Sequence, residues 1–210
     1  MKMTHDTIRL LIDEAGIEDY TISKDLCVVF RSDAIFDSKV CKSLKKAIVD
    51  NLGIFPFKIL EAAGDLVLSR MFLISLLNMP VRVGGNFNVS NNKLRSLVHC
   101  PLTIARDFIC GGNKDITTLD FGPMNVGGDY DATNCGLINC SQLAKRVGKD
   151  VRLSDNTLRS IPSGVAIGGD CYLSNNLFIE QPILGGLKGM LIIENNPCNP
   201  SDEFEKNTWG

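Results

Sequence analysis

The chain repeats one pattern of about ten residues seven times, and this repetition restricts its fold more than any other feature. VGGNFNVSNN, which begins at Val83, and IGGDCYLSNN, which begins at Ile167, are two of the clearest copies. The copies begin 20 to 22 residues apart, at Ala62, Val83, Ile104, Val126, Val147, Ile167 and Leu187. A unit of this length cannot bury an apolar face alone, so successive units must stack. The sequence therefore predicts a solenoid.

Each copy holds two apolar residues separated by one residue that we expect to be exposed. The pairs are Leu66/Leu68, Phe87/Val89, Phe108/Cys110, Tyr130/Ala132, Val151/Leu153, Cys171/Leu173 and Leu191/Ile193. This period of two predicts a short strand with one buried face. Stacked copies would form a parallel sheet of about seven short strands.

An Asn follows the second apolar residue by three positions in five of the copies. These residues are Asn92, Asn113, Asn156, Asn176 and Asn196, whereas Met71 and Cys135 occupy the position in the other two copies. A buried Asn can hydrogen-bond backbone groups of the turning chain, so stacked copies would form a ladder. The Gly-Gly pairs before the strands are expected to permit a sharp bend. They are not expected to bind phosphate, because neither a helix nor a GK(S/T) sequence follows them.

This pattern resembles the leucine-rich repeat LxLxxNxL, here FNVSNNKL, VRLSDNTL and CYLSNNLF. VGG(D/N)F…SNN(K)L(R/T)SL, with a Pro before the next copy, is also similar to compact leucine-rich-repeat proteins encoded by tailed bacteriophages. The likeness is strongest from Ala62 to Asn196 and extends in layout from Tyr20 to Pro200. It implies a right-handed α/β solenoid with irregular or 3₁₀ return segments, and a viral origin. A predicted helix at 38–51 departs from the family pattern, and the resemblance implies little about function.

Three regions are expected: an N-terminal cap at 1–61, the leucine-rich-repeat solenoid at 62–200 and a C-terminal tail at 201–210. The cap should contain a helix that starts at Thr4 and stops at Gly16, then a hairpin and a second helix. The hairpin is predicted between 26–30 and 34–36, around the turn at 31–33. In the tail, Trp209 is expected either to fold back over the last coil or to remain disordered.

Composition excludes several classes of function. The net charge is −2 and no run of five basic residues occurs, which argues against a dedicated nucleic-acid binder. The longest apolar stretch, 71–79, is too short to span a bilayer, and the N-terminus lacks the apolar core of a signal peptide. We therefore expect a protein with no membrane partner. It should lie in the cytoplasm, or the host cytoplasm if it is viral, with its eight Cys as free thiols.

Residues suited to catalysis or metal binding are few. The two histidines, His5 and His99, are far apart in the sequence, and His99 falls in a turn between repeats. Cys110, Cys140 and Cys171 occupy apolar repeat positions, and no Cys pair has the spacing of a zinc site. We therefore expect no catalytic residue, no metal and no cofactor.

An acid or Asn precedes the first buried residue of six predicted strands. The residues are Asp65, Asn86, Asp107, Asp129, Asp150 and Asp170. Parallel stacking would align them along one edge, where they could attract cations or a basic partner. The alternative is that each accepts hydrogen bonds from turn amides. Because a structural role predicts recurrence in every unit, we favour the second interpretation.

Variable positions within a repeat are the best candidates for recognition. The exposed mid-strand residue differs between copies, and the residue after the second buried position is mostly small. The predicted partner-binding residues are Asn88, Ile109, Asp131, Arg152, Tyr172 and Ile192, with Val67 at the same repeat position. Tyr and Arg often anchor interfaces. A cross-strand ion pair between Asp131 and Arg152 is the competing structural explanation.

The sequence thus predicts a noncatalytic protein–protein interaction module that binds through the concave face of its sheet. By analogy with the phage family, the partner would be a host protein, and inhibition of a host enzyme or defence factor is one use of such binding. Two alternatives remain open: a structural component of a virion, or an enzyme whose site lies in the N-terminal 60 residues. The oligomeric state is also open.

Overall fold

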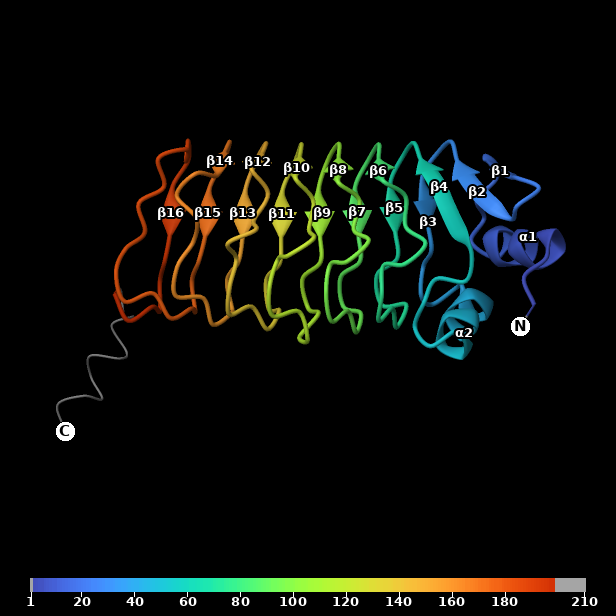
Figure 1. The fold of residues 1–210 in the computed structure, drawn as a ribbon, viewed down its shortest axis with the longest axis horizontal. Helices are drawn as coiled ribbons and strands as arrows, with labels where there is room; N and C mark the ends of the chain where they lie inside the picture. The colour runs from blue at the N-terminus through green and yellow to red at the C-terminus, as the bar shows by residue number, and fades with distance from the viewer. Residues whose placement is uncertain (1, 199–210) are drawn as a thin grey trace.

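The computed structural model describes residues 2–198 and forms a parallel β-solenoid with two eight-stranded sheets along its length (Figure 1). Sheet A contains β1 (Tyr20–Ile22), β2 (Cys27–Phe30), β4 (Lys58–Ala62), β6 (Arg82–Val83), β8 (Thr103–Ile104), β10 (Asn125–Val126), β12 (Arg146–Val147) and β14 (Ala166–Ile167). Sheet B contains β3 (Ala34–Ile35), β5 (Leu66–Val67), β7 (Phe87–Asn88), β9 (Phe108–Ile109), β11 (Tyr130–Asp131), β13 (Val151–Arg152), β15 (Cys171–Tyr172) and β16 (Leu191–Ile192). Within one repeat, the chain passes from a strand of sheet A through a tight corner to a strand of sheet B.

The predicted solenoid is confirmed, and its predicted strands are those of sheet B from β5 to β16. The α/β character is not supported, because among residues 2–198 the only helices are α1 (His5–Asp13) and α2 (Lys42–Asp50). Sheet A was not expected. From β6 onward each of its strands has two residues, of which only one is buried, so no alternation marks them in the sequence.

The predicted hairpin between 26–30 and 34–36 is wrong. β2 pairs antiparallel with β1 and parallel with β4, whereas β3 pairs with β5 in the other sheet. The polar segment 31–33 is therefore a corner between sheets: Asp33 Oδ1 accepts a hydrogen bond from the Asp65 N–H at 2.8 Å, as later corners do. A hairpin and a corner between two sheets both place a polar turn between two short apolar runs. The sequence therefore did not distinguish these two arrangements.

The N-terminal end of the solenoid carries α1 and the β1–β2 hairpin (Figure 1). α1 begins after Thr4, whose hydroxyl accepts a hydrogen bond from the Thr7 N–H, and it buries Ile8, Leu11 and Ile12. α2 lies on the return segment between β3 and β4 and buries Leu44, Ala47 and Ile48. The interpretation of Trp209 concerns a residue outside the described range.

Buried Asn side chains form the predicted ladder, which we call the Asn ladder: Asn92, Asn113, Asn156, Asn176 and Asn196. Asn113 is typical. Its Oδ1 accepts from the Leu94 N–H at 3.1 Å, and its Nδ2 donates to the carbonyls of Val89 and Cys110 at 3.0 and 2.7 Å. Each such Asn thus bonds backbone groups of two successive coils, which the interior shields from water.

Cys135 replaces Asn in the coil that follows the one-residue insertion. The ladder position there would face the N–H of Ile116, but that N–H already donates to the Asn113 carbonyl at 3.1 Å. Only an acceptor for the Cys135 thiol remains necessary, and the Cys110 carbonyl supplies it at 3.6 Å. The inserted residue therefore explains why this coil does not need an Asn.

The residue before each ladder position has a left-handed backbone. The seven residues are Arg70, Asn91, Gly112, Asn134, Asp155, Asn175 and Asn195, with φ from 51° to 76°. Asn, Asp and Gly tolerate this region better than other residues do. The two letters of each Asn-Asn pair therefore have different roles: the first turns the chain and the second bonds it internally.

Aromatic rings stack in the core below sheet B, and Tyr130 provides a test of their energetics. The ring centroids of Phe87 and Phe108 lie 6.0 Å apart, and those of Phe108 and Tyr130 lie 5.0 Å apart. The Tyr130 hydroxyl is buried and makes no hydrogen bond within the described residues. Burial also raises the pKa of this phenol well above its ordinary value.

We expect Tyr130→Phe to stabilise the fold by about 1 kcal/mol, because it removes a buried polar group that has no partner. Urea denaturation followed by circular dichroism would measure the change. Phe108→Tyr is the matched reverse substitution in the neighbouring coil and should destabilise the protein. A loss of stability in Tyr130→Phe would show that the hydroxyl has a bonding partner.

Candidate protein-interaction surface on sheet B

The six predicted partner-binding residues lie in one row on the outer face of sheet B. The pairing of β7, β9, β11, β13, β15 and β16 places Asn88, Ile109, Asp131, Arg152, Tyr172 and Ile192 directly beside one another. We call these residues the sheet B row. All are partly exposed, whereas their strand neighbours on either side face the core. The structure therefore brings the candidate residues together, and their role in binding remains a prediction.

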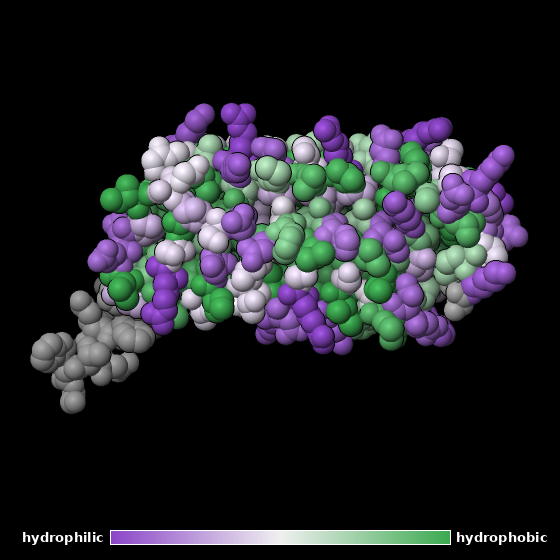
Figure 2. Space-filling view, viewed as in Figure 1, coloured by the Kyte–Doolittle hydropathy of each residue, from purple (hydrophilic) through white to green (hydrophobic). Residues whose placement is uncertain are grey.

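The coils stack side by side along the long axis of the molecule (Figure 1), so the row crosses six successive coils. Hydrophobic and hydrophilic residues are mixed over the visible side of the molecule (Figure 2). A row that crosses several coils and combines polar and apolar side chains offers contacts from each of them.

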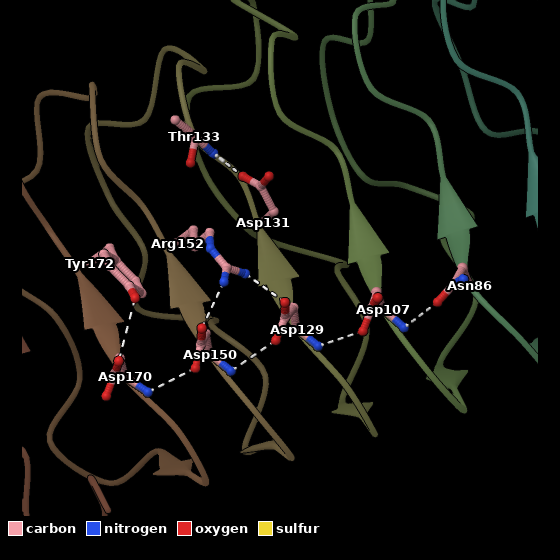
Figure 3. Close-up of polar contacts among 9 residues, drawn as sticks. All are labelled: Asn86, Asp107, Asp129, Asp131, Thr133, Asp150, Arg152, Asp170 and Tyr172. Atoms are coloured by element: carbon pink, nitrogen blue, oxygen red, sulfur yellow. Dashed lines mark hydrogen bonds and ion pairs between the residues drawn. The ribbon is translucent and has the colours of Figure 1, made fainter. Parts of the chain in front are cut away.

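Arg152 is held by two carboxylates, one at the corner before its own strand β13 and one at the corner before β11 in the preceding coil. Its two terminal nitrogens lie 2.6 Å from Asp129 Oδ2 and 2.6 Å from Asp150 Oδ2 (Figure 3). The expected ion pair with Asp131 is therefore not the one that forms. Asp131 Oδ1 instead accepts the N–H of Thr133 at 2.8 Å, within its own strand end. Asp150 and Arg152 are two residues apart, so both lie on the same face of the strand. The ladder bonds use Oδ1 of Asp129 and of Asp150, which leaves their Oδ2 atoms for Arg152.

The charges at this corner affect one another. Partial burial alone would raise the pKa of the Asp129 carboxyl, but the hydrogen bond from Arg152 and the Asp150 N–H outweigh it. The pKa of Asp129 therefore lies below its ordinary value. For Arg152, partial burial would lower the pKa, and Asp129 and Asp150 outweigh it in the raising direction. Both groups remain charged at neutral pH.

Tyr172 extends this arrangement into the next coil. The Arg152 guanidinium carbon lies 5.3 Å from the centre of its ring, within the range of a cation–π interaction. The Tyr172 hydroxyl donates to Asp170 Oδ2 at 3.3 Å (Figure 3). Arg152 and Tyr172 are thus held in fixed positions while part of each side chain remains exposed to solvent.

The residues before the strands of sheet B form a second ladder, which we call the acid ladder: Asp33, Asp65, Asn86, Asp107, Asp129, Asp150 and Asp170. It begins at Asp33, one coil earlier than we predicted. Each rung accepts a hydrogen bond from the backbone N–H of the next coil. The donors are the N–H groups of Asp65, Asn86, Asp107, Asp129, Asp150, Asp170 and Met190, at 2.7 to 3.1 Å. The structural interpretation of these residues is therefore confirmed. At Asp129, Asp150 and Asp170 the second oxygen binds Arg152 or Tyr172, a contribution to the surface that we did not predict.

The glycines beside the acid ladder leave room for it. A side-chain carbon at Gly128 would overlap the Asp107 carboxylate, and one at Gly169 would overlap Asp150. Neither glycine has a positive φ, so close approach explains them and an unusual backbone angle does not. We expected these Gly-Gly pairs to permit a bend. The structure instead indicates that a larger residue at Gly128 or Gly169 would collide with the acid ladder of the preceding coil.

The N-terminal 60 residues, where an enzyme site was the alternative, contain an open cleft of about 580 Å³ between α1 and β1. His5, Arg9, Asp13 and Tyr20 are among its lining residues. Its polar groups bond mainly to one another and to the backbone: the Tyr20 hydroxyl donates to Asp13 at 2.9 Å, and His5 Nε2 lies 3.0 Å from the Ser23 carbonyl. These contacts hold α1 against the hairpin.

Thiols of the repeats lie in the core. Burial raises the pKa of both Cys140 and Cys171 to about 12, so these thiols are uncharged at neutral pH and poor nucleophiles. Within residues 2–198, no three His, Cys, Asp or Glu side chains come together in a way that would hold a metal ion. In the same range, no helix has the length and apolar character required to cross a membrane.

Comparisons with models of protein families, with curated proteins and with solved structures gave no match to this chain. The fold and the sheet B row therefore provide the basis for assigning a class and a role.

Proposed function

We propose that the protein is a noncatalytic protein-binding module that recognises its partner through the sheet B row. The observation that supports this role most strongly is the fixed arrangement of Arg152 and Tyr172. Arg and Tyr frequently dominate interface energetics. Because Asp129, Asp150 and Asp170 already hold these side chains in place, binding costs less conformational entropy than it would with free side chains. The flanking Ile109 and Ile192 add apolar contact area.

The identity of the repeat and the partner are also part of the proposal. The Asn ladder and the LxLxxNxL spacing support a leucine-rich-repeat origin, of the kind found in tailed phages. On that basis the partner is a host protein in the host cytoplasm, and inhibition of a host enzyme or defence factor is the use we propose.

The test is affinity capture with a variant that leaves the Arg152 ion pairs intact. We expect Asp131→Lys/Tyr172→Ala to lose the proteins that the wild type enriches from host lysate, as measured by quantitative mass spectrometry. Arg95→Ala/Lys114→Ala, on the return side of the coils, is the matched control and should retain them. Thermal melts would establish that all three proteins are folded. Equal capture by both variants would exclude the sheet B row as the binding surface.

A further inference from the structure

Sheet A carries a row of exposed aliphatic side chains at the point where each coil enters the sheet. Leu60, Val81, Leu102 and Met124 occupy the same position in four successive coils and are 47 to 63% exposed. The Leu102 N–H donates to the Val81 carbonyl at 2.8 Å, and the Met124 N–H donates to the Leu102 carbonyl at 2.9 Å. We call these four residues the sheet A row.

Packing in the core does not explain these four apolar side chains, because each is about half exposed to solvent. A strand spacing of about 4.8 Å makes it roughly 15 Å long. Exposed apolar residues are ordinary when they are single, but a contiguous group indicates a contact surface. The fifth coil has Lys145 at the same position, which shows that a polar residue is compatible with the fold.

Basic side chains surround the sheet A row. Lys58, Arg82 and Arg146 are exposed on the strands of sheet A, and Lys145 is exposed just before β12. Arg106 and Lys149 lie in the corners beyond, beside the carboxylates of the acid ladder, and Arg106 is 3.9 Å from Asp65. Glu61, in the pairing position of Arg82, is the acidic residue on these strands. On and directly before the strands β4 to β14, basic residues therefore outnumber acidic ones, although the whole chain has a net charge of −2. A partner that fits it must combine apolar and acidic groups.

An amphipathic acidic helix meets both requirements. Its apolar residues at i, i+3, i+7 and i+10 form a stripe about 15 Å long, at about 1.5 Å per residue, which matches the length of the row. Acidic residues on both sides of the stripe would meet the cations. Nucleic acid fits less well, because phosphate groups would bind the cations but make no favourable contact with the four aliphatic side chains between them. A lipid surface also fits less well, because interfacial anchors bury their apolar face about 5 to 10 Å into the boundary between headgroups and acyl chains. The half-exposed side chains of the sheet A row project too little to reach that depth.

We propose that sheet A is a second docking surface, which binds an acidic amphipathic helix of a protein partner. It is separated from the sheet B row by the corner that carries the acid ladder, so both faces can be occupied together. This goes beyond binding at sheet B, because it makes the protein an adaptor that joins two partners.

The experiment uses a synthetic fluorescein-labelled helix with leucines on one face and glutamates on its flanks, and fluorescence anisotropy as the readout. Its lysine counterpart is the matched control peptide. We expect the full-length protein to bind the glutamate peptide about tenfold or more tightly than the lysine peptide. Leu102→Glu/Met124→Glu should weaken binding of the glutamate peptide by a similar factor. Tyr172→Ala, on sheet B, should leave it unchanged.

A charge exchange makes the test more specific. Arg82→Glu/Arg146→Glu should lose the glutamate peptide and gain affinity for the lysine peptide, which a general loss of structure cannot produce. Vesicles of phosphatidylcholine with phosphatidylglycerol, and a single-stranded polyuridine RNA, would be tested in parallel. Equal binding of both peptides, insensitivity to the sheet A substitutions, or binding of vesicles or RNA in preference to the glutamate peptide would each overturn the proposal. Failure of the sheet B variants to lose a host partner would not affect this result.

Discussion

Replacing Asn113 with Ala should lower the free energy of unfolding by about 4 kcal/mol, the largest effect that we expect from any single substitution. The side chain is fully buried and bonds three backbone groups: the Leu94 N–H and the carbonyls of Val89 and Cys110. Alanine would leave the Leu94 N–H buried without a partner, at about 1 to 3 kcal/mol, and would remove one of two hydrogen bonds from each carbonyl, at about 1 kcal/mol apiece. Asn92 Nδ2 and the Cys135 thiol would still donate to these carbonyls. Urea denaturation followed by circular dichroism would measure the change.

Cys135→Ala is the matched control, because Cys135 occupies the same ladder position in the next coil. Its thiol makes one long bond, to the Cys110 carbonyl at 3.6 Å. We expect its substitution to cost about 1 kcal/mol, largely from lost packing. If Asn113→Ala and Cys135→Ala destabilise equally, the Asn ladder does not have the structural role that its geometry indicates.

The two sheets differ in how far the sequence alone could predict them. Leu153 and Val151 alternate with exposed residues, so sheet B was predictable from period two alone. Val147 is the single buried residue of a two-residue strand in sheet A, and one residue carries no period. The return segments were expected to be irregular or 3₁₀, and those of the described repeats consist of turns and bends, with α2 as the helix on the return segment between β3 and β4.

The candidate site was predictable in position but not in detail. Copy-to-copy variation identified Arg152 and Tyr172, and strand pairing places them side by side. The partner of Arg152 was not predictable from adjacency across strands, which favours Asp131. A long guanidinium reaches back along its own strand to Asp150 and across to Asp129, and that choice depends on which carboxylate oxygens the acid ladder leaves available.

Arg152→Leu should destabilise the protein by about 2 kcal/mol at pH 7. The substitution removes both ion pairs and leaves Asp129 and Asp150 close together without a cation. Fully buried pairs would have a larger effect, but 34% of the Arg152 side chain is exposed, so water screens part of the interaction. Arg106→Leu is the matched control: Arg106 lies 3.9 Å from Asp65, 70% of its side chain is exposed, and its loss should cost less than about 0.5 kcal/mol.

The pH dependence distinguishes this charge effect from a packing effect. The pKa of Asp129 is lower in the folded state than in the unfolded state, so its stabilising contribution is present above its unfolded pKa of about 3.9. That contribution is lost as the pH falls through the folded-state value, because protonation then removes the charge that Arg152 binds. Arg152→Leu removes the cause of the lowered pKa, so the stability difference between wild type and variant should be large at pH 7 and should shrink at lower pH. Urea denaturation of both proteins at pH 7, and at a pH below the unfolded-state pKa of about 3.9, would measure this stability difference. A difference that is independent of pH would assign the loss to packing of the Arg152 side chain against Tyr172, and the fixed charge arrangement that supports binding at the sheet B row would then lack its energetic basis.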